Sequence, residues 1–424
     1  MKKKAIAAAV AAAFAVPALA QVEVYGSLDV SYNDGSISNT TKAGVKVKQD
    51  YSGVNRAVNL ATSSGQTLSA TTGQATTNGV TETRGALTGS RFGIRAKEDL
   101  GGGLTANANI EFDLDPSIGS LRNLGARTST VGLAGGFGSV SVGRQTTGIH
   151  SVVTATSPIS GSNMVGDVVY STGFRIHMAQ NNNGAANPNV DPVQFDQGSA
   201  TAIGSASSAV RANNLVAYTS PVFSGGSVRL DYASDKKGSS TAADIRETSN
   251  LGLSFRFVNG PITATAGTHT VEGTTSVAAG TPVKSKFTVN AIGASYDLKV
   301  AKINAIYAEN KTEDLTATAN NSENEVWQLG ISIPMGPWTF AGQYGEGDRS
   351  QGATYASKNT YSGYQLAAVY TLSKRTNIYA AYGTDEIKNT LGASQGTVPA
   401  WGSGASEGAK SERSQMAFGL RHSF

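Results

Sequence analysis

The chain contains no cysteine among its 424 residues, which excludes disulfide bonds, cysteine-ligated zinc and thiolate catalysis. It also lacks any run of 18 consecutive apolar residues, so we expect no membrane-spanning helix. Only 39% of the residues are hydrophobic. A soluble β protein fits this composition. A membrane barrel fits it equally well, because each of its strands needs an apolar side chain only at every second position.

The first twenty residues have the features of a secretory signal peptide. Lys2, Lys3 and Lys4 precede an apolar stretch from 5 to 16 and the small-residue site Ala18-Leu19-Ala20. That stretch is about twelve residues long, whereas a spanning helix needs about 20. We therefore predict a signal peptide at 1–20, cleaved after Ala20, and a mature chain at 21–424.

Cleavage changes the net charge. Of the 34 basic residues, three leave with the signal peptide, so 34 − 3 = 31 basic residues face 30 acidic ones, a net charge of +1. The high isoelectric point therefore gives no indication of nucleic-acid binding, and we expect no nucleic-acid partner.

From Val22 onward, the chain repeats one unit: about ten residues that alternate between apolar and polar, followed by a connector rich in Gly, Ser, Thr or Asn. This pattern is typical of antiparallel strands. Sixteen strands are predicted, at 22–33, 89–98, 104–113, 127–134, 138–146, 211–220, 226–235, 248–257, 261–271, 285–297, 300–311, 323–333, 337–348, 361–372, 376–386 and 413–424.

The connectors alternate in length. Short turns follow the even strands, for example 99–103, 135–137 and 259–260, and long connectors follow the odd strands, for example 34–88, 147–210 and 387–412. Short periplasmic turns, long extracellular loops and an even strand number are typical of a transmembrane β-barrel of the outer membrane. The fold class predicted is therefore all-β, a transmembrane antiparallel barrel.

The faces of the strands agree with a barrel. Leu251, Leu253 and Phe255 alternate with Ser254 and Arg256. The apolar face would meet lipid, and the charged face a water-filled lumen, because an unpaired charge is costly in a dry core. Aromatic residues near strand ends suggest interfacial girdles: Tyr25, Tyr32, Tyr296, Trp338, Tyr344, Tyr364, Tyr370 and Tyr382.

Several segments resemble the general porin family of Gram-negative bacteria, most closely the β-proteobacterial type. They are the first strand at 22–29, the hairpin start at 90–101, the segment 131–145, the turn 372–376 and the terminal Phe424. The resemblance implies a homotrimeric outer-membrane channel for small hydrophilic solutes and ions. It further implies contact with lipid and lipopolysaccharide, insertion by the barrel-assembly machinery, and a third loop, at about 147–210, that folds into the pore.

Two connectors leave the strand number open. Connector three contains a possible extra hairpin at 168–170 and 174–178, which would give eighteen strands if both segments crossed the membrane. Connector one contains a similar candidate at about 45–60.

The candidate constriction is a basic wall. Alternation puts Arg91, Arg95 and Lys97 on the lumen face of one strand, and Arg127 and Arg211 begin two others near the outer side. The alternative is that these are ordinary solvated lumen charges. In connector three, Asp167 is the best candidate for an opposing acid. One acid against several basic residues predicts mild anion preference, and a solute-specific channel is the alternative function.

Arg144 shares the outward face with Val140 and Val142, where a lone charge facing lipid costs about 2 to 4 kcal/mol near the midplane. We therefore predict a subunit contact with an acid of a neighbouring subunit, such as Asp115. The alternative is that Arg144 lies at a strand end and reaches the lipid headgroups.

Nothing in the sequence indicates an enzyme. The four histidines lie in separate segments without metal-ligand spacing or a nucleophile motif, so no metal or cofactor is predicted. The last strand instead carries apolar side chains on its lipid face. By resemblance, Phe418, Leu420 and Phe424 form the signal read by the assembly machinery.

Overall fold

A computed structural model describes the chain from residue 21, apart from 41–43, 45, 58–66, 69–74, 77–81, 84, 118, 122–126, 160–163, 170–209, 238–245, 276–282, 316–320, 352–356 and 392–409. The predicted signal peptide therefore lies outside the described residues. Within the part of the chain that is described, no helix is long and apolar enough to cross a membrane.

The strands follow the predicted units closely. Their bounds are β1 Gln21–Thr40, β2 Lys46–Val54, β3 Arg56–Ala57, β4 Thr67–Leu68, β5 Ala75–Thr76, β6 Glu82–Thr83, β7 Arg91–Gly101, β8 Leu104–Asp115, β9 Ser120–Leu121, β10 Thr128–Gly135, β11 Gly138–Thr146, β12 Arg211–Thr219, β13 Gly226–Lys237, β14 Arg246–Asn259, β15 Ile262–Thr275, β16 Val283–Asp297, β17 Lys302–Asp314, β18 Ser322–Met335, β19 Trp338–Gln351, β20 Ser357–Thr371, β21 Thr376–Leu391 and β22 Lys410–Ser423. The helix α2, Gly148–Ala155, follows β11.

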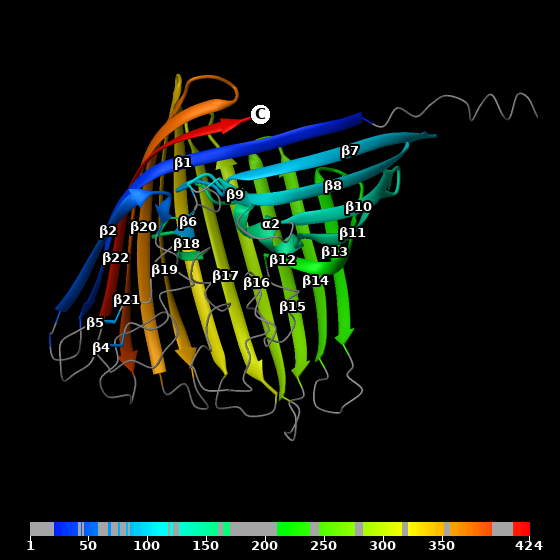
Figure 1. Cartoon of the computed structure of the whole chain (residues 1–424). Coiled ribbons are helices and arrows are strands. Elements are labelled where there is room, and N and C mark those ends of the chain that lie inside the picture. Colours follow the sequence, from blue (N-terminus) through cyan, green and yellow to red (C-terminus); the bar gives the residue numbers. More distant parts are fainter. Residues whose placement is uncertain are drawn as a thin grey trace, which may run out of the picture.

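The sixteen strands β1, β7, β8 and β10 to β22 form a closed antiparallel barrel (Figure 1). Closure depends on β1, whose first part pairs with β7 from Gln21 to Ser27 and whose remainder pairs with β22 from Ser27 to Thr40. No edge is left open to lipid, as a spanning sheet requires. The short turns lie together at one end, which is the periplasmic end of such a barrel.

The eighteen-strand alternative is not adopted. β11 pairs directly with β12, so no strand is inserted between them. Val168 and Val169 are instead buried inside the barrel, and 174–178 lie outside the described residues. In connector one, the candidate segment contains the strand β2, which pairs with the outer half of β1 and is not a separate strand of the barrel, while 45 and 58–60 lie outside the described residues.

One sector of the barrel wall, called here the low sector, is built from shorter strands than the rest. Strands β7, β8 and β10 to β12 have 8 to 12 residues, whereas β14 to β22 have 13 to 16. Figure 1 shows the long strands extending well past the short ones.

The faces are as predicted from alternation. Outward apolar side chains are exposed, for example Leu251 at 63% and Leu329 at 53%. Most of the aromatic side chains predicted to form the interfacial girdles also point outward. Tyr25 is an exception, because it lies on the same face as Ser27 and Asp29 and donates to Asn109 and Glu111 across the lumen wall.

Candidate functional site: the channel lumen

The predicted basic wall is closely associated with acids. Arg127 Nε donates to Glu111 at 2.8 Å, and its Nη1 donates to Asp113. Arg91 Nε lies 3.9 Å from the same Glu111. Because both carboxylates are on β8, next to β7 in the barrel, each basic side chain has an acid within reach. The charge of this wall is therefore largely neutralised locally.

Arg95 is neutralised in the same way. It donates through Nε and Nη2 to the two oxygens of Glu23, at 2.9 and 2.8 Å, and its guanidinium lies 5.1 Å from the centre of the Tyr25 ring. Both members of the pair are about half exposed, so the pair contributes little to stability. Lys97 lies beyond it toward the short-turn end and is exposed.

The three acids Glu23, Glu111 and Asp113 are not among the site residues predicted from the sequence. Alternation along 104–113 places Glu111 and Asp113 on the lumen face, so that signal was available. What the sequence could not give was the stagger of β7 against β8, which brings Arg91 opposite Asp113.

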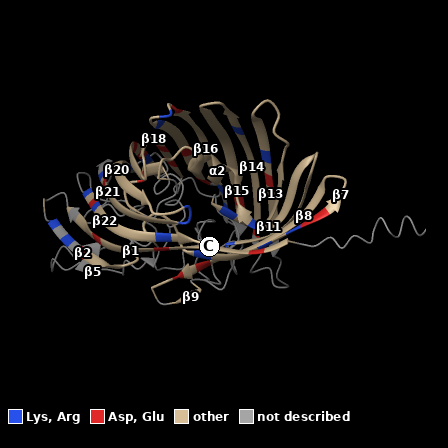
Figure 2. Cartoon of the chain, turned by 90° about the horizontal axis from the view of Figure 1, so that it is seen from above, with Lys and Arg blue, Asp and Glu red and all other residues tan. Residues whose placement is uncertain are grey.

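The segment after β11 lies inside the barrel (Figure 2). Helix α2 begins after Thr147, whose side chain accepts from His150 N. The N–H of Gly148 donates to Asp231 at 2.5 Å. The apolar side chains of α2 pack on an apolar area of the inner wall formed by β15 to β18, with these members: Ile149, Val152, Val153, Val271, Phe287, Val289, Ala291, Ile306, Ala308 and Val326.

Glycines on the inner wall let this segment come close to the strands. An added Cβ would lie 2.5 Å from Thr156 Oγ1 at Gly293 and 2.6 Å from Pro158 at Gly330. At Gly383 it would lie 2.0 Å from the carbonyl oxygen of Val165. Because backbone cannot move aside as easily as a side chain, a larger residue at the third position would have to displace the loop. These glycines define the path of the loop along the wall.

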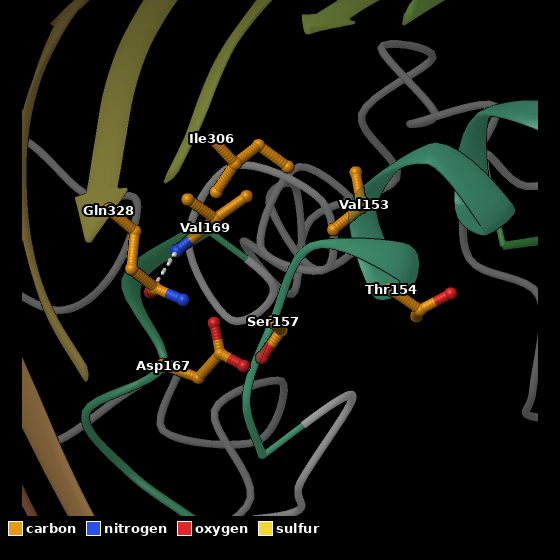
Figure 3. Close-up of a pocket in the computed structure, with 7 residues that line it drawn as sticks. All are labelled: Val153, Thr154, Ser157, Asp167, Val169, Ile306 and Gln328. Carbon is orange, nitrogen blue, oxygen red and sulfur yellow. Dashed lines mark hydrogen bonds between the residues drawn. The ribbon is translucent and has the colours of Figure 1, made fainter. Parts of the chain in front are cut away.

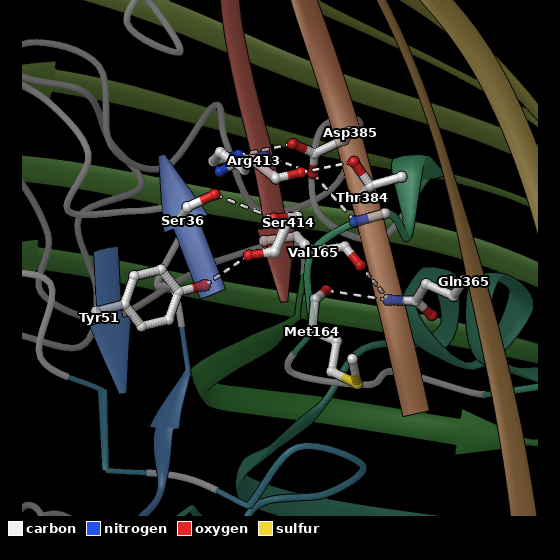
Figure 4. A network of polar contacts seen from close by, with 10 residues as sticks. Ser36, Tyr51, Met164, Val165, Gln365, Thr384, Asp385, Arg413 and Ser414 are labelled. Carbon is white, nitrogen blue, oxygen red and sulfur yellow. Dashed lines mark hydrogen bonds and ion pairs between the residues drawn. The ribbon is translucent and has the colours of Figure 1, made fainter. Parts of the chain in front are cut away.

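The turn at 164–166 is held by a buried ion pair (Figure 4). Arg413 donates twice to Asp385, at 2.7 Å for both contacts, and both side chains are almost fully buried. The second oxygen of Asp385 also accepts from Gly166 N at 3.0 Å. Gln365 donates to the carbonyl oxygens on the same turn, Met164 at 3.1 Å and Val165 at 2.9 Å.

Asp167 lies in a small recess lined by Val153, Thr154, Ser157, Val169, Ile306 and Gln328 (Figure 3). It is only 1% exposed, and the neighbouring Val168 N–H donates to Gln328 at 3.1 Å. The recess is against β17 and β18, far around the barrel from β7. The structure therefore does not bring Asp167 to the basic wall.

A second inward segment precedes β7. Asp29 is fully buried and accepts from the Tyr379 hydroxyl at 2.5 Å and from the Thr88 N–H at 2.7 Å. Ala86 and Leu87 are buried with Met164 in one apolar cluster. Connector one and connector three therefore meet inside the barrel, beside β20 to β22 and β1.

The remaining predicted residues are separate. Arg211 begins β12 and is half buried opposite Thr146. Arg144 donates to Asn213 Oδ1 at 2.6 Å beside a bulge in β11. Asp115 is buried and accepts from the N–H and hydroxyl of Ser117, at 3.0 and 2.5 Å. Phe418, Leu420 and Phe424 are outward and exposed by 42 to 53%.

The comparisons with known proteins agree with this arrangement. The sequence profile of the Gram-negative porins matches residues 7–390. The chain belongs to this family. The porin is 31% identical to outer membrane porin protein 32 of Delftia acidovorans, over 81% of the chain and 86% of that protein. It is 26% identical to an outer membrane porin protein of Bordetella pertussis, over 91% of the chain and 94% of that protein.

Solved structures show the same fold. An anion-selective porin from Comamonas acidovorans superposes on the porin with a TM-score of 0.61 at 24% identity, covering 96% of the chain and all of that protein. The trimer form of OmpT from Vibrio cholerae gives a TM-score of 0.56 at 14% identity, covering 96% and 99%. The protein is thus an outer-membrane porin that forms a channel for small solutes.

Proposed function

We propose that this porin is a general diffusion channel for small hydrophilic solutes and ions, with a mild preference for anions. The observation that carries the proposal is an inner wall on which Arg and Lys side chains remain exposed to water beside two inward segments that narrow the lumen. Ion flow through such a pore depends on its width and fixed charge, and no bond is made or broken. Similarity to a porin described as anion-selective supports the sign of the preference.

Planar-bilayer recording of the purified porin tests this function. We expect stable single-channel steps whose conductance rises with salt, and a reversal potential in a KCl gradient that corresponds to chloride preference. Clear cation preference at neutral pH would reject the anion part of the proposal. Saturation of conductance block by one sugar would instead favour the solute-specific channel.

A homotrimer is the assembly that the outer surface supports. Outward positions on β7, β8, β10 and β11 carry apolar side chains such as Ile94, Ile110, Val131 and Leu133, but these four strands contain no Tyr or Trp. Tyr and Trp belts mark lipid–water interfaces. A low, apolar sector without that belt is suited to contact with other subunits, and Arg144 lies in it.

We also infer that the porin is exported by the predicted signal peptide and assembled through its last strand. The mass of the mature protein tests the first part, since cleavage after Ala20 leaves Gln21 as the first residue.

A further inference from the structure

Among the described residues, four basic side chains at the short-turn end of the lumen form no ion pair within 4.0 Å, unlike Arg91, Arg95 and Arg127. They are Lys97, Arg256, Lys302 and Arg421. We propose that this group, called here the vestibule ring, attracts small anions and supplies a large share of the anion preference of the porin. The inference rests on the proposed channel function and assigns its charge selectivity to Lys97 of the predicted constriction together with three residues outside it.

All four side chains are at inward positions. Phe255 is outward and 40% exposed, whereas Ser254 is inward and buried, so Arg256 shares the inward face. Ile303, 47% exposed, and Leu420, 49% exposed, place Lys302 and Arg421 inward by the same alternation. Lys97 and Arg256 are nevertheless exposed, which means that water reaches this part of the lumen.

The ring lies on the short-turn side of the inward residues 147–159 and 164–169. Ser254, the next inward position of β14, meets the start of that segment, because an added Cβ on Gly148 would lie 2.3 Å from Ser254 Oγ. Ile306, two inward positions beyond Lys302, lines the recess beside the same segment. The four strands β7, β14, β17 and β22 are never neighbours, so the charges are distributed around the wall.

The acids at this level keep their charge, but they are opposed to only part of the ring. Lys302 is opposite Asp297 in register, and Arg421 is opposite Asp29. Lys97 and Arg256 are opposed in register only by neutral residues, which are Gln21, Asn107, Ser227 and Thr265. Glu23 is paired with Arg95, and the carboxylates of Asp99 and Asp297 accept from the N–H groups of Gly101 and Lys299 in their own turns. Asp29, opposite Arg421 in register, is buried under Tyr379 and Thr88. Among the described side chains, no carboxylate lies within 4.0 Å of a basic group of the ring.

Arg421 is half buried, with Asp29 opposite it in register on one side and Asn377 on the other, and its Nη2 donates to the Asn377 amide oxygen at 3.0 Å. Lys97 and Arg256 therefore hold positive charge in water with no carboxylate opposite them in register, whereas the charges of Arg91 and Arg127 are balanced by Glu111 and Asp113. Coulomb attraction in open water extends about 10 Å at 0.1 M salt and about 3 Å at 1 M salt. Selectivity due to the ring should consequently weaken as salt rises.

The test replaces three ring residues in the full-length porin, Lys97→Gln, Arg256→Gln and Lys302→Gln together. Reversal potentials are measured in KCl gradients centred near 0.1 M and near 1 M. We expect the chloride-to-potassium permeability ratio to fall at least about two-fold at the lower salt and to change little at the higher salt. Arg421 is kept, because it belongs to the strand that closes the barrel.

A matched control changes the same total charge on the outer surface. Lys286→Gln, Lys311→Gln and Lys388→Gln remove three lysines that are paired with Glu272, Glu313 and Glu386 on outward positions. The permeability ratio of this variant should equal that of the unchanged porin. The single Arg256→Gln variant should give a smaller fall, and it tests the same idea if the triple variant assembles poorly.

Three results would overturn the proposed role of the vestibule ring in anion preference. They are an unchanged ratio at the lower salt, an equal fall at both salts, and an equal fall in the control variant. Each is distinct from failure of the proposed function, in which the unchanged porin passes no ions or prefers cations. If the unchanged porin prefers chloride and the ring variants retain that preference, only the ring is rejected.

Discussion

At the scale of single residues, Gly383 shows how the wall accepts the inward loop. Its missing side chain leaves room for the carbonyl oxygen of Val165, which an added Cβ would approach to 2.0 Å. Gly342 is a useful contrast, because it is outward and its nearest neighbour is the flexible end of Leu366 at 3.2 Å. Two glycines in neighbouring parts of the wall thus have very different tolerance for a methyl group.

We predict that Gly383→Ala displaces the turn at 164–166 and lowers stability by about 1 to 3 kcal/mol, the usual cost of forcing extra volume into a packed site. Single-channel traces should show additional conductance levels, and the folded band on a heat-shift gel should be lost at lower temperature. Gly342→Ala is the control and should change neither reading. Normal traces from Gly383→Ala would contradict the close packing.

The last residue is a second case. The Phe424 N–H and carbonyl both bond to Gly26, at 3.1 Å each, and the Phe424 ring lies so close to Gly26 that an added Cβ would meet it at 2.4 Å. The terminal aromatic residue therefore completes the closure of β22 on β1.

Deleting Phe424 should reduce the amount of folded porin in the outer membrane, because two closing hydrogen bonds and a ring contact are lost. The channels that do form should keep their conductance, since Phe424 points away from the lumen. Quantitative blotting of membrane fractions, together with bilayer recording of the surviving channels, measures both effects. Phe137→Ala, another exposed aromatic change at the short-turn end, is the control and should leave assembly unchanged.

At the scale of elements, loop three is connected to three strands through one buried ion pair. Asp385 on β21 binds Arg413 on β22 and Gly166 of the loop, and Gln365 on β20 holds the same turn. The strand β2 of connector one joins this group, because the Tyr51 hydroxyl donates to the carbonyl of Ser414 at 3.0 Å. Elements distant in sequence are therefore linked beside the pore.

We predict that Asp385→Asn lowers stability by about 3 to 5 kcal/mol, since it leaves the buried Arg413 charge without its counter-ion. Current noise should rise as the turn at 164–166 loosens. Glu386→Gln is the matched control. It removes a charge from the next residue of β21, but this residue faces outward in partly exposed pairs, where about 0 to 1 kcal/mol is expected. Equal effects in both variants would contradict the role of Asp385 in holding the turn.

At the scale of the whole molecule, the low sector of the wall is the surface proposed for trimer contact. Arg144 lies there beside a bulge, and within its own subunit it bonds to Asn213. Asp115 is close to Ser117 in its own subunit, so a contact between Arg144 and a neighbouring Asp115 remains a prediction.

Replacing Arg144 by Ala should weaken the trimer, so that monomer appears on a native gel at a lower temperature than for the unchanged porin. Lys311→Ala, an outward charge outside the low sector, serves as the control and should not shift the transition. An unchanged trimer in Arg144→Ala would favour the alternative in which this side chain reaches the headgroups.

The sequence by itself determined the faces of the strands and the end at which the short turns lie, and it left the strand number at sixteen or eighteen until the pairing of β11 with β12 decided it. The faces and the turns are local properties, because alternation and turn composition are read within ten or so residues. The tertiary structure decided which charges neutralise one another and where loop three lies. Arg91 meets Glu111 only because of the stagger between β7 and β8, and Asp167 turns into a recess because glycines on distant strands admit the loop. Such contacts depend on strand register and closure of the barrel, which no single segment specifies.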